Sequence, residues 1–199
     1  MKTKNLILFI LLIAGISAKA QLLDSLALSK VPEYTELSKA LQNPDSVYKL
    51  DLHKQKLTEI PKEVFKLTNL QELNVSKNKI TKIPPNISKL KNLEVLNVSA
   101  NKIDTIPPEI GKLVNIKRLI LNQNEIVYLP KTIGSLTKMY YLDMWGNKIQ
   151  EFPNEIYKLQ NTLKVLDLRV IQIREEKQED IQDQLPKTKI FFSKSCNCQ

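Results

Sequence analysis

Apolar and polar residues alternate in short stretches that recur along most of the chain. In one such stretch Leu73 and Val75 alternate with Glu72, Asn74 and Ser76. A period of two is typical of a β-strand that has one buried face and one face turned towards solvent. The pattern therefore predicts a series of short strands, each with its leucine side facing a core.

These stretches belong to a longer unit that repeats every 23 residues, and prolines, leucines and asparagines each keep that spacing. The three series are Pro61, Pro84, Pro107, Pro130 and Pro153; Leu67, Leu90, Leu113, Leu136 and Leu159; and Asn78, Asn101, Asn124 and Asn147. We count six units over residues 47–174, of which the first is slightly degenerate and the last is truncated. Such a repeat predicts a solenoid in which each unit contacts only its neighbours.

A unit of 23 residues is too short for a strand and a full helix with two loops. We therefore expect the segment after each Ile-Pro pair to be a turn or a short helix. Proline suits the first position of such a turn, because it fixes φ and donates no hydrogen bond. No unit buries enough apolar surface to fold alone, so stability must come from stacking.

The units, LxxLxLxxNxI followed by xxIPxxIxxLxx, resemble the leucine-rich-repeat family over about two-thirds of the chain. The resemblance implies an α/β fold: a curved solenoid with a parallel sheet on its concave face and turns or short helices on its convex face. It also implies that Asn78, Asn101, Asn124 and Asn147 form a structural ladder that bonds backbone groups in the turns. An unsatisfied buried group would cost about 1–3 kcal/mol.

A solenoid exposes apolar layers at both ends unless caps cover them. We interpret residues 21–46 as an N-terminal helical cap, with a helix over residues 33–42. In that helix Leu37, Ala40 and Leu41 would share one face.

Residues 175–199 predict a C-terminal cap and tail, with a charged helix from Glu175 to Leu185 and a short closing strand from Ile190 to Phe192. A similar arrangement of caps and repeats is familiar from small exported repeat proteins of bacteria, especially Bacteroidetes. The resemblance then covers nearly all of the chain and leaves no segment for a separate enzyme module.

The first 20 residues have the features of a secretory signal peptide. Lys2 and Lys4 precede an apolar run from Leu6 to Ile16, and small residues end at Ala20. A basic start, a short apolar run and small residues before the cut are typical of such a peptide. The run is shorter than the roughly 20 apolar residues of a membrane span. We predict that residues 1–20 are removed, that the chain is secreted or periplasmic/extracellular, and that it has no transmembrane anchor.

The formal net charge is +9, from 30 lysines and arginines against 21 acidic residues. The basic residues are scattered among acidic ones, and few aromatic residues alternate with them, as a single-strand nucleic-acid groove would require. We therefore interpret the lysines as solvated surface and predict that the chain does not bind nucleic acid.

The sequence predicts no enzyme, no cofactor and no metal. The single histidine, His53, lies about five units from Cys196. A catalytic base and its nucleophile must lie within hydrogen-bond distance, so these two residues are too far apart to act together. The four glycines do not form a phosphate loop, and two thiols without support make a weak metal site. Cys196 and Cys198 form a frayed tail, a strained local disulfide or a link to a second chain, and the sequence leaves these alternatives open.

Residues that point outwards from the strands form a grid on the concave face, and one corner of it is unlike the rest. The single tryptophan, Trp145, projects there between Asn122 and Arg169. Tryptophan, tyrosine and arginine dominate the binding energy of interfaces. We predict a binding patch formed by Arg118, Ile120, Asn122, Tyr141, Asp143, Trp145, Val165 and Arg169. In the alternative interpretation, Trp145 only stacks on Arg169 as a surface cation–π pair.

The sequence thus favours a secreted protein-binding module that recognises a macromolecular partner through its concave face. Two alternatives stay open. A glycan or another cell-envelope component could stack on Tyr141 and Trp145, as in a carbohydrate or cell-wall adhesin. A thiol-dependent enzyme or redox factor would instead use Cys196 and Cys198.

Overall fold

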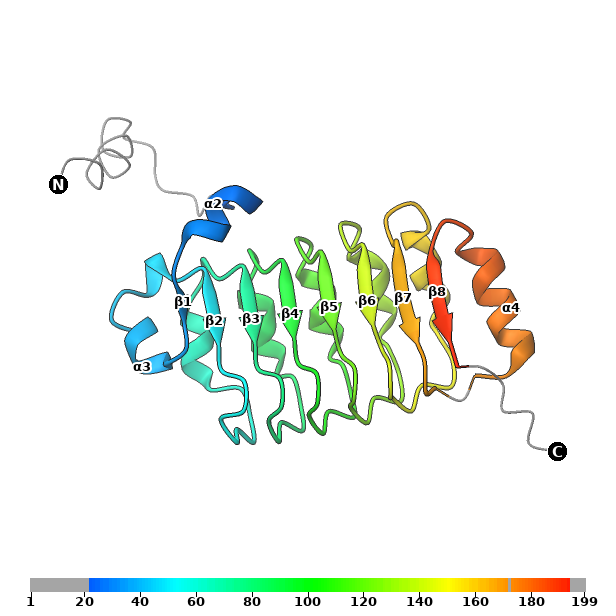
Figure 1. The fold of residues 1–199 in the computed structure, drawn as a ribbon, viewed down its shortest axis with the longest axis horizontal. Helices are drawn as coiled ribbons and strands as arrows, with labels where there is room; N and C mark the ends of the chain where they lie inside the picture. The colour runs from blue at the N-terminus through cyan, green and yellow to red at the C-terminus, as the bar shows by residue number, and fades with distance from the viewer. Residues whose placement is uncertain (1–21, 172, 194–199) are drawn as a thin grey trace.

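The computed structural model describes residues 22–171 and 173–193 and contains one sheet of eight strands in chain order (Figure 1). Every neighbouring pair of strands is parallel. The strands are β1 (Glu33–Tyr34), β2 (Lys49–Asp51), β3 (Glu72–Asn74), β4 (Val95–Asn97), β5 (Arg118–Ile120), β6 (Tyr141–Asp143), β7 (Val165–Leu168) and β8 (Lys189–Phe192). The predicted α/β solenoid is confirmed.

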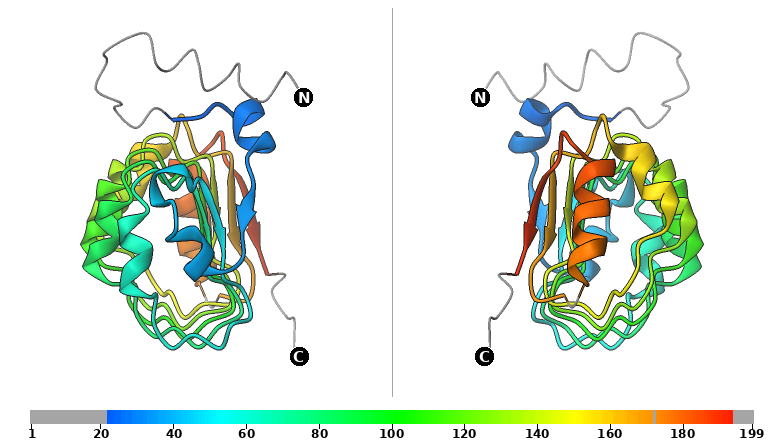
Figure 2. Two further views of the ribbon diagram at one scale, coloured as in Figure 1. Left: turned by 90° about the vertical axis from the view of Figure 1, so that its left-hand side faces the viewer. Right: turned by 90° about the vertical axis from the view of Figure 1, so that its right-hand side faces the viewer.

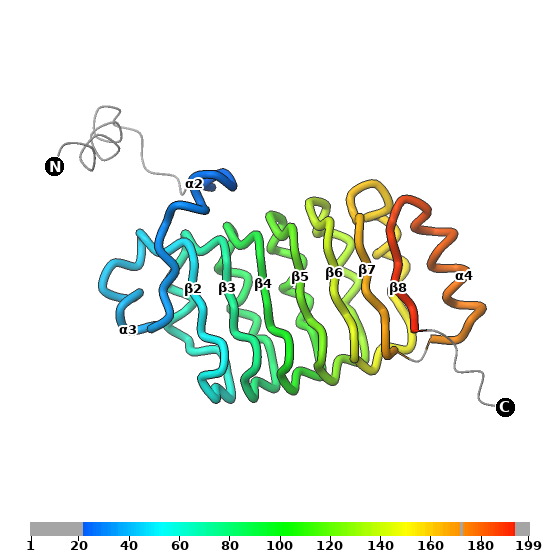
Figure 3. The backbone as a smooth tube through the Cα atoms, viewed as in Figure 1, coloured from blue at the N-terminus to red at the C-terminus, as the bar shows by residue number. Residues whose placement is uncertain are grey.

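Figure 2 views the solenoid from its two ends, with the sheet on one side and short helical segments on the opposite, convex side. The sheet surface turned away from the core is the concave face. The path of the backbone in Figure 3 shows how each unit runs from a strand to the convex side and back to the next strand. Corresponding positions of successive units therefore lie next to one another.

Apolar side chains form continuous layers behind the sheet. One layer consists of the register partners Leu50, Leu73, Leu96, Leu119, Leu142 and Leu166. None of these six leucines is more than 1% exposed. Each unit thus buries its leucines against those of its neighbours, which a unit of this size cannot do alone.

The convex segments are 3-10 helices, the tightest helical form that a short return segment can take. They are η2 (Lys62–Lys66), η3 (Pro85–Lys89), η4 (Pro108–Lys112), η5 (Lys131–Ser135) and η6 (Asn154–Leu159). The repeated proline precedes each one; the Pro107 carbonyl, for example, accepts the Ile110 N–H at 3.0 Å. Neighbouring segments approach so closely that a Cβ atom on Gly134 would lie 2.3 Å from the Glu155 carbonyl oxygen.

The repeated asparagines bond the backbone of two units at once. The Asn101 amide donates to the carbonyls of Val75 and Val98 at 3.0 and 2.9 Å and accepts the Ile80 N–H at 2.9 Å. Equivalent bonds surround Asn78, Asn124 and Asn147. At the first unit Gln55 takes this position and donates to the Thr35 carbonyl at 2.9 Å.

The N-terminal segment differs from the single helix that the sequence predicts over residues 33–42. It contains α2 (Ser25–Lys30), β1, α3 (Leu37–Ala40) and the 3-10 turn η1 (Pro44–Ser46). Glu33 and Tyr34 are extended because they add a strand to the sheet, opposite Lys49 and Leu50. The prediction of a helix is wrong at its start, where sheet pairing satisfies the backbone. α3 nevertheless buries Ala40 completely.

At the C-terminal end, α4 (Glu175–Gln184) precedes β8, close to the positions that the sequence predicts. Ile181 and Leu185 are buried against the last unit. The predicted signal peptide and both Cys196 and Cys198 lie outside the described residues. Among the helices that the structure describes, none is long and apolar enough to span a membrane.

Candidate functional site

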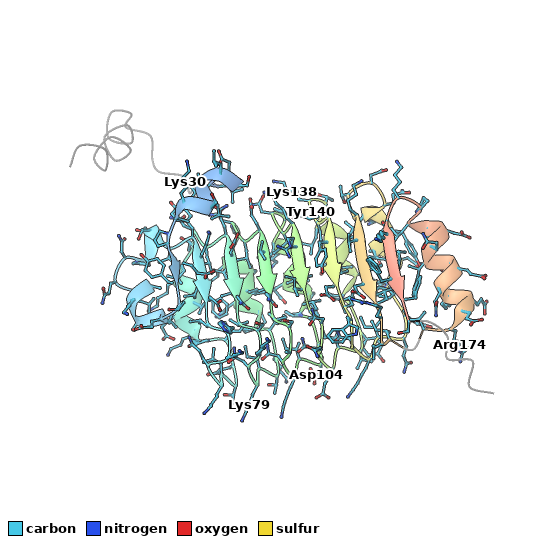
Figure 4. The ribbon with its side chains drawn as sticks, viewed as in Figure 1. Lys30, Lys79, Asp104, Lys138, Tyr140 and Arg174 are labelled. Carbon is cyan, nitrogen blue, oxygen red and sulfur yellow. The ribbon has the colours of Figure 1, made fainter. Side chains whose placement is uncertain are left out.

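The sheet register brings the eight residues of the predicted patch into three adjoining units. Tyr141 lies between Arg118 and Val165, and Asp143 lies between Ile120 and Asp167. The remaining residues, Asn122, Trp145 and Arg169, lie in the turns that follow β5, β6 and β7. Figure 4 shows the side chains along this face of the sheet.

Backbone bonds hold these turns together beyond the ends of the strands. The Gln123 N–H donates to the Trp145 carbonyl at 2.7 Å, and the Gly146 N–H donates to the Arg169 carbonyl at 2.9 Å. Gly146 has a φ of +66°, a conformation that glycine adopts at little steric cost. The turns therefore extend the sheet by one more ladder position, and Trp145 sits on that rigid extension.

Asp143 lies beneath the patch surface rather than on it, with 9% of its area exposed. Its Oδ1 accepts the Trp145 N–H at 3.1 Å, and its Oδ2 accepts a bond from the Asn122 amide. Burial raises the pKa of Asp143 and nearby Asp167 acts in the same direction, while the two hydrogen bonds oppose the shift. Asp143 thus orients Trp145, and a partner would meet it only indirectly.

The same turn recurs along the concave face. The side chains of Asp51, Asn74, Asn97 and Asp167 accept the N–H two residues ahead at distances of 2.8 to 3.1 Å. A short acidic or amide side chain that bonds the backbone in this way is a common turn former. The fifth unit therefore uses its aspartate as part of the scaffold, as the first, second, third and sixth units use the aspartate or asparagine at this position.

Arg118 and Tyr141 form the side of the patch where β5 and β6 begin, and the Arg118 guanidinium carbon lies 5.4 Å from the centroid of the Tyr141 ring. Arg118 is exposed and Tyr141 is half-buried. Burial is the main cause that raises the pKa of Tyr141, so its hydroxyl stays protonated as a hydrogen-bond donor. The pair is a fixed amphipathic surface of the kind found at binding interfaces.

Arg169 is held by Asp167 and by a ring that the patch prediction did not include. Its Nη2 lies 2.6 Å from Asp167 Oδ2, and its Nε lies 3.0 Å from Asp167 Oδ1. These bonds are the main cause that raises the pKa of Arg169. Within the described residues, the ring under the Arg169 guanidinium is that of Phe191, 5.7 Å away. The alternative interpretation, in which Trp145 stacks on Arg169, is therefore wrong.

Phe191 and Lys189 are the residues that sequence reasoning missed. They lie on β8 opposite Asp167 and Val165, and Lys189 Nζ lies 4.9 Å from the Phe191 ring centroid. Alternation along β8 could have identified them, because Ile190 and Phe192 pack against the core and the alternate residues, Lys189 and Phe191, are left for the concave face. We use the name aromatic patch for the aromatic and basic side chains of the predicted patch together with these two residues: Arg118, Tyr141, Trp145, Arg169, Lys189 and Phe191.

The side chains on the other half of the concave face are mostly polar. Ser76 is only 6% exposed, and the Ser99 hydroxyl donates to Asn97 at 2.7 Å. His53 Nδ1 lies 2.9 Å from Asp51 Oδ1, at the opposite end of the sheet from the aromatic patch. Within the described residues, no three histidine, cysteine or acidic side chains come together as a metal site would require.

Comparisons with known proteins identify the family. A family model described as leucine rich repeat matches residues 45–103 and 91–149, which together span more than half of the chain. The chain therefore belongs to the leucine-rich-repeat family. No curated protein matches the sequence.

Solved structures of leucine-rich-repeat proteins share this architecture. A leucine-rich-repeat protein of Leptospira interrogans is 31% identical, with a TM-score of 0.63, and the match covers 81% of this chain and 46% of that protein. Internalin C2 of Listeria monocytogenes is 22% identical, with a TM-score of 0.68 and coverages of 82% and 69%, and shows the fold alone.

A third match is the ectodomain of a plant membrane receptor kinase from Arabidopsis thaliana, solved in complex with Casparian strip integrity factor 2. It is 26% identical, with a TM-score of 0.58, and the match covers 68% of this chain. The chain spans less than half of the leptospiral protein and 17% of the plant ectodomain. The leucine-rich-repeat fold is commonly a module for protein interactions.

Proposed function

We propose that this chain is a secreted, non-enzymatic protein-binding module whose partner docks on the aromatic patch. The observation that carries the proposal is the gathering of three aromatic and three basic side chains on four neighbouring strands, β5 to β8, and the turns after them. Residues of these types supply most of the binding energy at protein interfaces. The concave face of the first units offers mostly polar side chains instead.

The patch is also ordered before a partner arrives. Arg118 is held by Tyr141, and Arg169 is held by both Asp167 and Phe191. Side chains that are already fixed lose little conformational freedom on binding, which favours affinity. The plant ectodomain in its complex supports a protein as the partner.

A glycan on the same patch is less favoured by the geometry. A sugar ring stacks on a free aromatic face, but Tyr141 and Phe191 each carry a basic group over one face. Trp145, which is half-buried, would be the remaining platform. We therefore place the protein partner first and the carbohydrate adhesin second.

Export from the cell rests on the sequence of residues 1–20. Sequencing the N-terminus of protein recovered outside the cytoplasm tests it, and Gln21 is the expected first residue. The non-enzymatic role is tested by replacing Cys196 and Cys198 with serine. Loss of function in a folded double variant would favour the thiol-dependent alternative.

The partner is sought by immobilising the chain and identifying proteins captured from envelope and host extracts by mass spectrometry. The comparison bait carries Arg118→Glu and Phe191→Ser, which remove one residue from each side of the patch. A protein that binds the patch should be captured by the unmodified chain and not by the variant. A glycan array probed with both baits addresses the adhesin. Capture that is equal on both baits, or found on the array alone, would refute the proposal.

A further inference from the structure

Lysines that are scattered in the sequence gather along one edge of the solenoid when the units stack. Lys56, Lys79 and Lys102 occupy the same position of the first three units. Backbone bonds join these turns, from the Lys79 N–H to the Leu57 carbonyl at 2.7 Å and from the Lys102 N–H to the Ile80 carbonyl at 2.9 Å. A spacing of 23 residues in sequence thus becomes about 5 Å in space, the distance between neighbouring strands.

A second column, Lys54 and Lys77, runs beside the first, and Lys82 adds a sixth charge. We call these six residues the basic edge; all six side chains are exposed. Figure 4 shows Lys79 projecting from the edge of the solenoid below the sheet, with Asp104 on the same edge. Glu59 and Asp104 are the acidic residues in the same turns, so the positive charge predominates.

These lysines are not used to hold the fold together. The ion pairs within the described residues involve Lys39, His53, Lys117, Lys148 and Arg169 instead. Lys54, Lys56 and Lys77 also have φ values of 57°, 59° and 56°, in the left-handed region. Glycine or asparagine would be more favourable there, so the local backbone does not explain the choice of lysine.

The basic edge ends where the aromatic patch begins. In the next two units the positions of Lys54 and Lys77 hold Gln123 and Gly146. The position of Lys56 holds Glu125 and then Lys148, which pair with each other at 2.9 Å. The charge is therefore a property of the first three units and not of the repeat.

From this arrangement we infer that the basic edge is a second binding site, for an acidic polysaccharide that carries carboxylate or sulfate groups at regular intervals. A linear polyanion that runs across the first three units would contact at least one lysine in each unit. A hollow of about 850 Å³ adjoins the edge, and its charged lining consists of Lys56, Lys62 and Lys82 together with Glu59 and Glu63. It gives a sugar ring room beside the charged row.

The side chains of the basic edge favour a polysaccharide over nucleic acid. Residues 54–59, 77–82 and 100–105 contain no aromatic side chain, whereas single-strand binding sites combine basic grooves with rings on which bases stack. The edge also contains no arginine, the residue suited to gripping phosphate with two parallel bonds. A lysine ammonium acts as a point charge that donates hydrogen bonds to carboxylates and sulfates alike.

The test measures binding of the purified full chain to labelled dextran sulfate and to alginate, with neutral dextran and a single-stranded oligonucleotide alongside. One variant carries Lys56→Glu, Lys79→Glu and Lys102→Glu. Its matched control carries the same three changes at Lys66, Lys89 and Lys112, a convex column of exposed lysines beside Glu63 and Glu109. The two variants have the same net charge, and circular dichroism checks that both are folded.

We expect the chain to bind dextran sulfate, alginate or both, and not neutral dextran. Whichever acidic polysaccharide binds more tightly identifies the preferred acid group, sulfate or carboxylate. Reversing the three charges of the basic edge should weaken polysaccharide binding by about 100-fold or more, since each lysine near an anionic surface contributes about a factor of five to the affinity. It should also lower the slope of log affinity against log salt by about three, one for each lysine. Equal losses in both variants, no polysaccharide binding, or tighter binding of the oligonucleotide would each overturn the inference.

Discussion

Replacing Asn124 with alanine tests how the turns hold the units together. Asn124 is 6% exposed, and its amide donates to the carbonyls of Val98 and Leu121 at 3.0 and 2.9 Å. Its oxygen accepts the N–H of fully buried Ile103 at 3.0 Å. Alanine supplies none of these bonds, and the surrounding units leave little room for water.

The expected loss follows from the groups left without partners. A buried donor without an acceptor costs about 1–3 kcal/mol, and the carbonyls cost less because they are more often left incompletely satisfied. We therefore expect Asn124→Ala to lower the free energy of unfolding by about 3 kcal/mol. The measurement is urea denaturation followed by circular dichroism, which separates a changed midpoint from a changed slope.

Asn115→Ala is the matched control because it makes the same chemical change on the convex side. The Asn115 amide also donates to a backbone carbonyl of the preceding unit, that of Lys91, at 2.9 Å, but this bond is exposed to solvent. Water can replace it, so the loss should stay below about 1 kcal/mol. If the two variants lost the same stability, or if Asn124→Ala lost less than about 1 kcal/mol, burial would not be what makes the ladder strong.

Three further predictions concern the patch, the convex side and pH. Trp145→Ala should weaken partner binding by about 2 kcal/mol or more in calorimetry but shift stability by less than about 1 kcal/mol, while Ser99→Ala at the equivalent position should change binding little. Gly134→Ala should lower the free energy of unfolding in urea by about 1–3 kcal/mol, because the new Cβ would overlap the neighbouring segment. The pKa of Asp143 is raised in the folded state, so protonation stabilises the fold below its ordinary value of 3.8, and this gain is lost as pH rises through the folded value. Asp143→Asn should therefore be more stable than the parent protein at neutral pH in thermal unfolding, and that advantage should shrink on acidification.

The sequence predicts the repeating part of the fold well because its physical requirements recur with it. Each unit needs the same leucines against the same neighbours, so the period of 23 identifies strand, turn and core together. The start of the N-terminal segment is different. Glu33 and Tyr34 occur once, and only the neighbouring Lys49 and Leu50 show that they belong to a strand. Local helix signals could not reveal a partner so far along the chain.

The arrangement of the proposed patch could be predicted in outline from the repeat, but its internal contacts could not. Placing Arg118, Tyr141 and Val165 side by side needs only the repeat register, which the sequence contains. Which ring lies under Arg169 depends instead on the register between β7 and β8, across the helix α4. That connection has no repeat to fix it, so the sequence suggested Trp145 where the structure has Phe191.

The lysines show why the surface of a repeat protein has to be interpreted by comparing residues at equivalent positions of successive units. Along the sequence, acidic residues lie between Lys54 and Lys102, and the charge looks dispersed. In the solenoid each unit runs from its strand to the convex side and back, and residues one unit apart become neighbours. A surface property of such a fold is therefore set by what recurs at one position and by where the recurrence stops. By that criterion the basic edge and the aromatic patch are separate, because they occupy different units of a scaffold in which each unit contacts only its neighbours. The two proposed sites therefore leave room for two ligands on the scaffold at once.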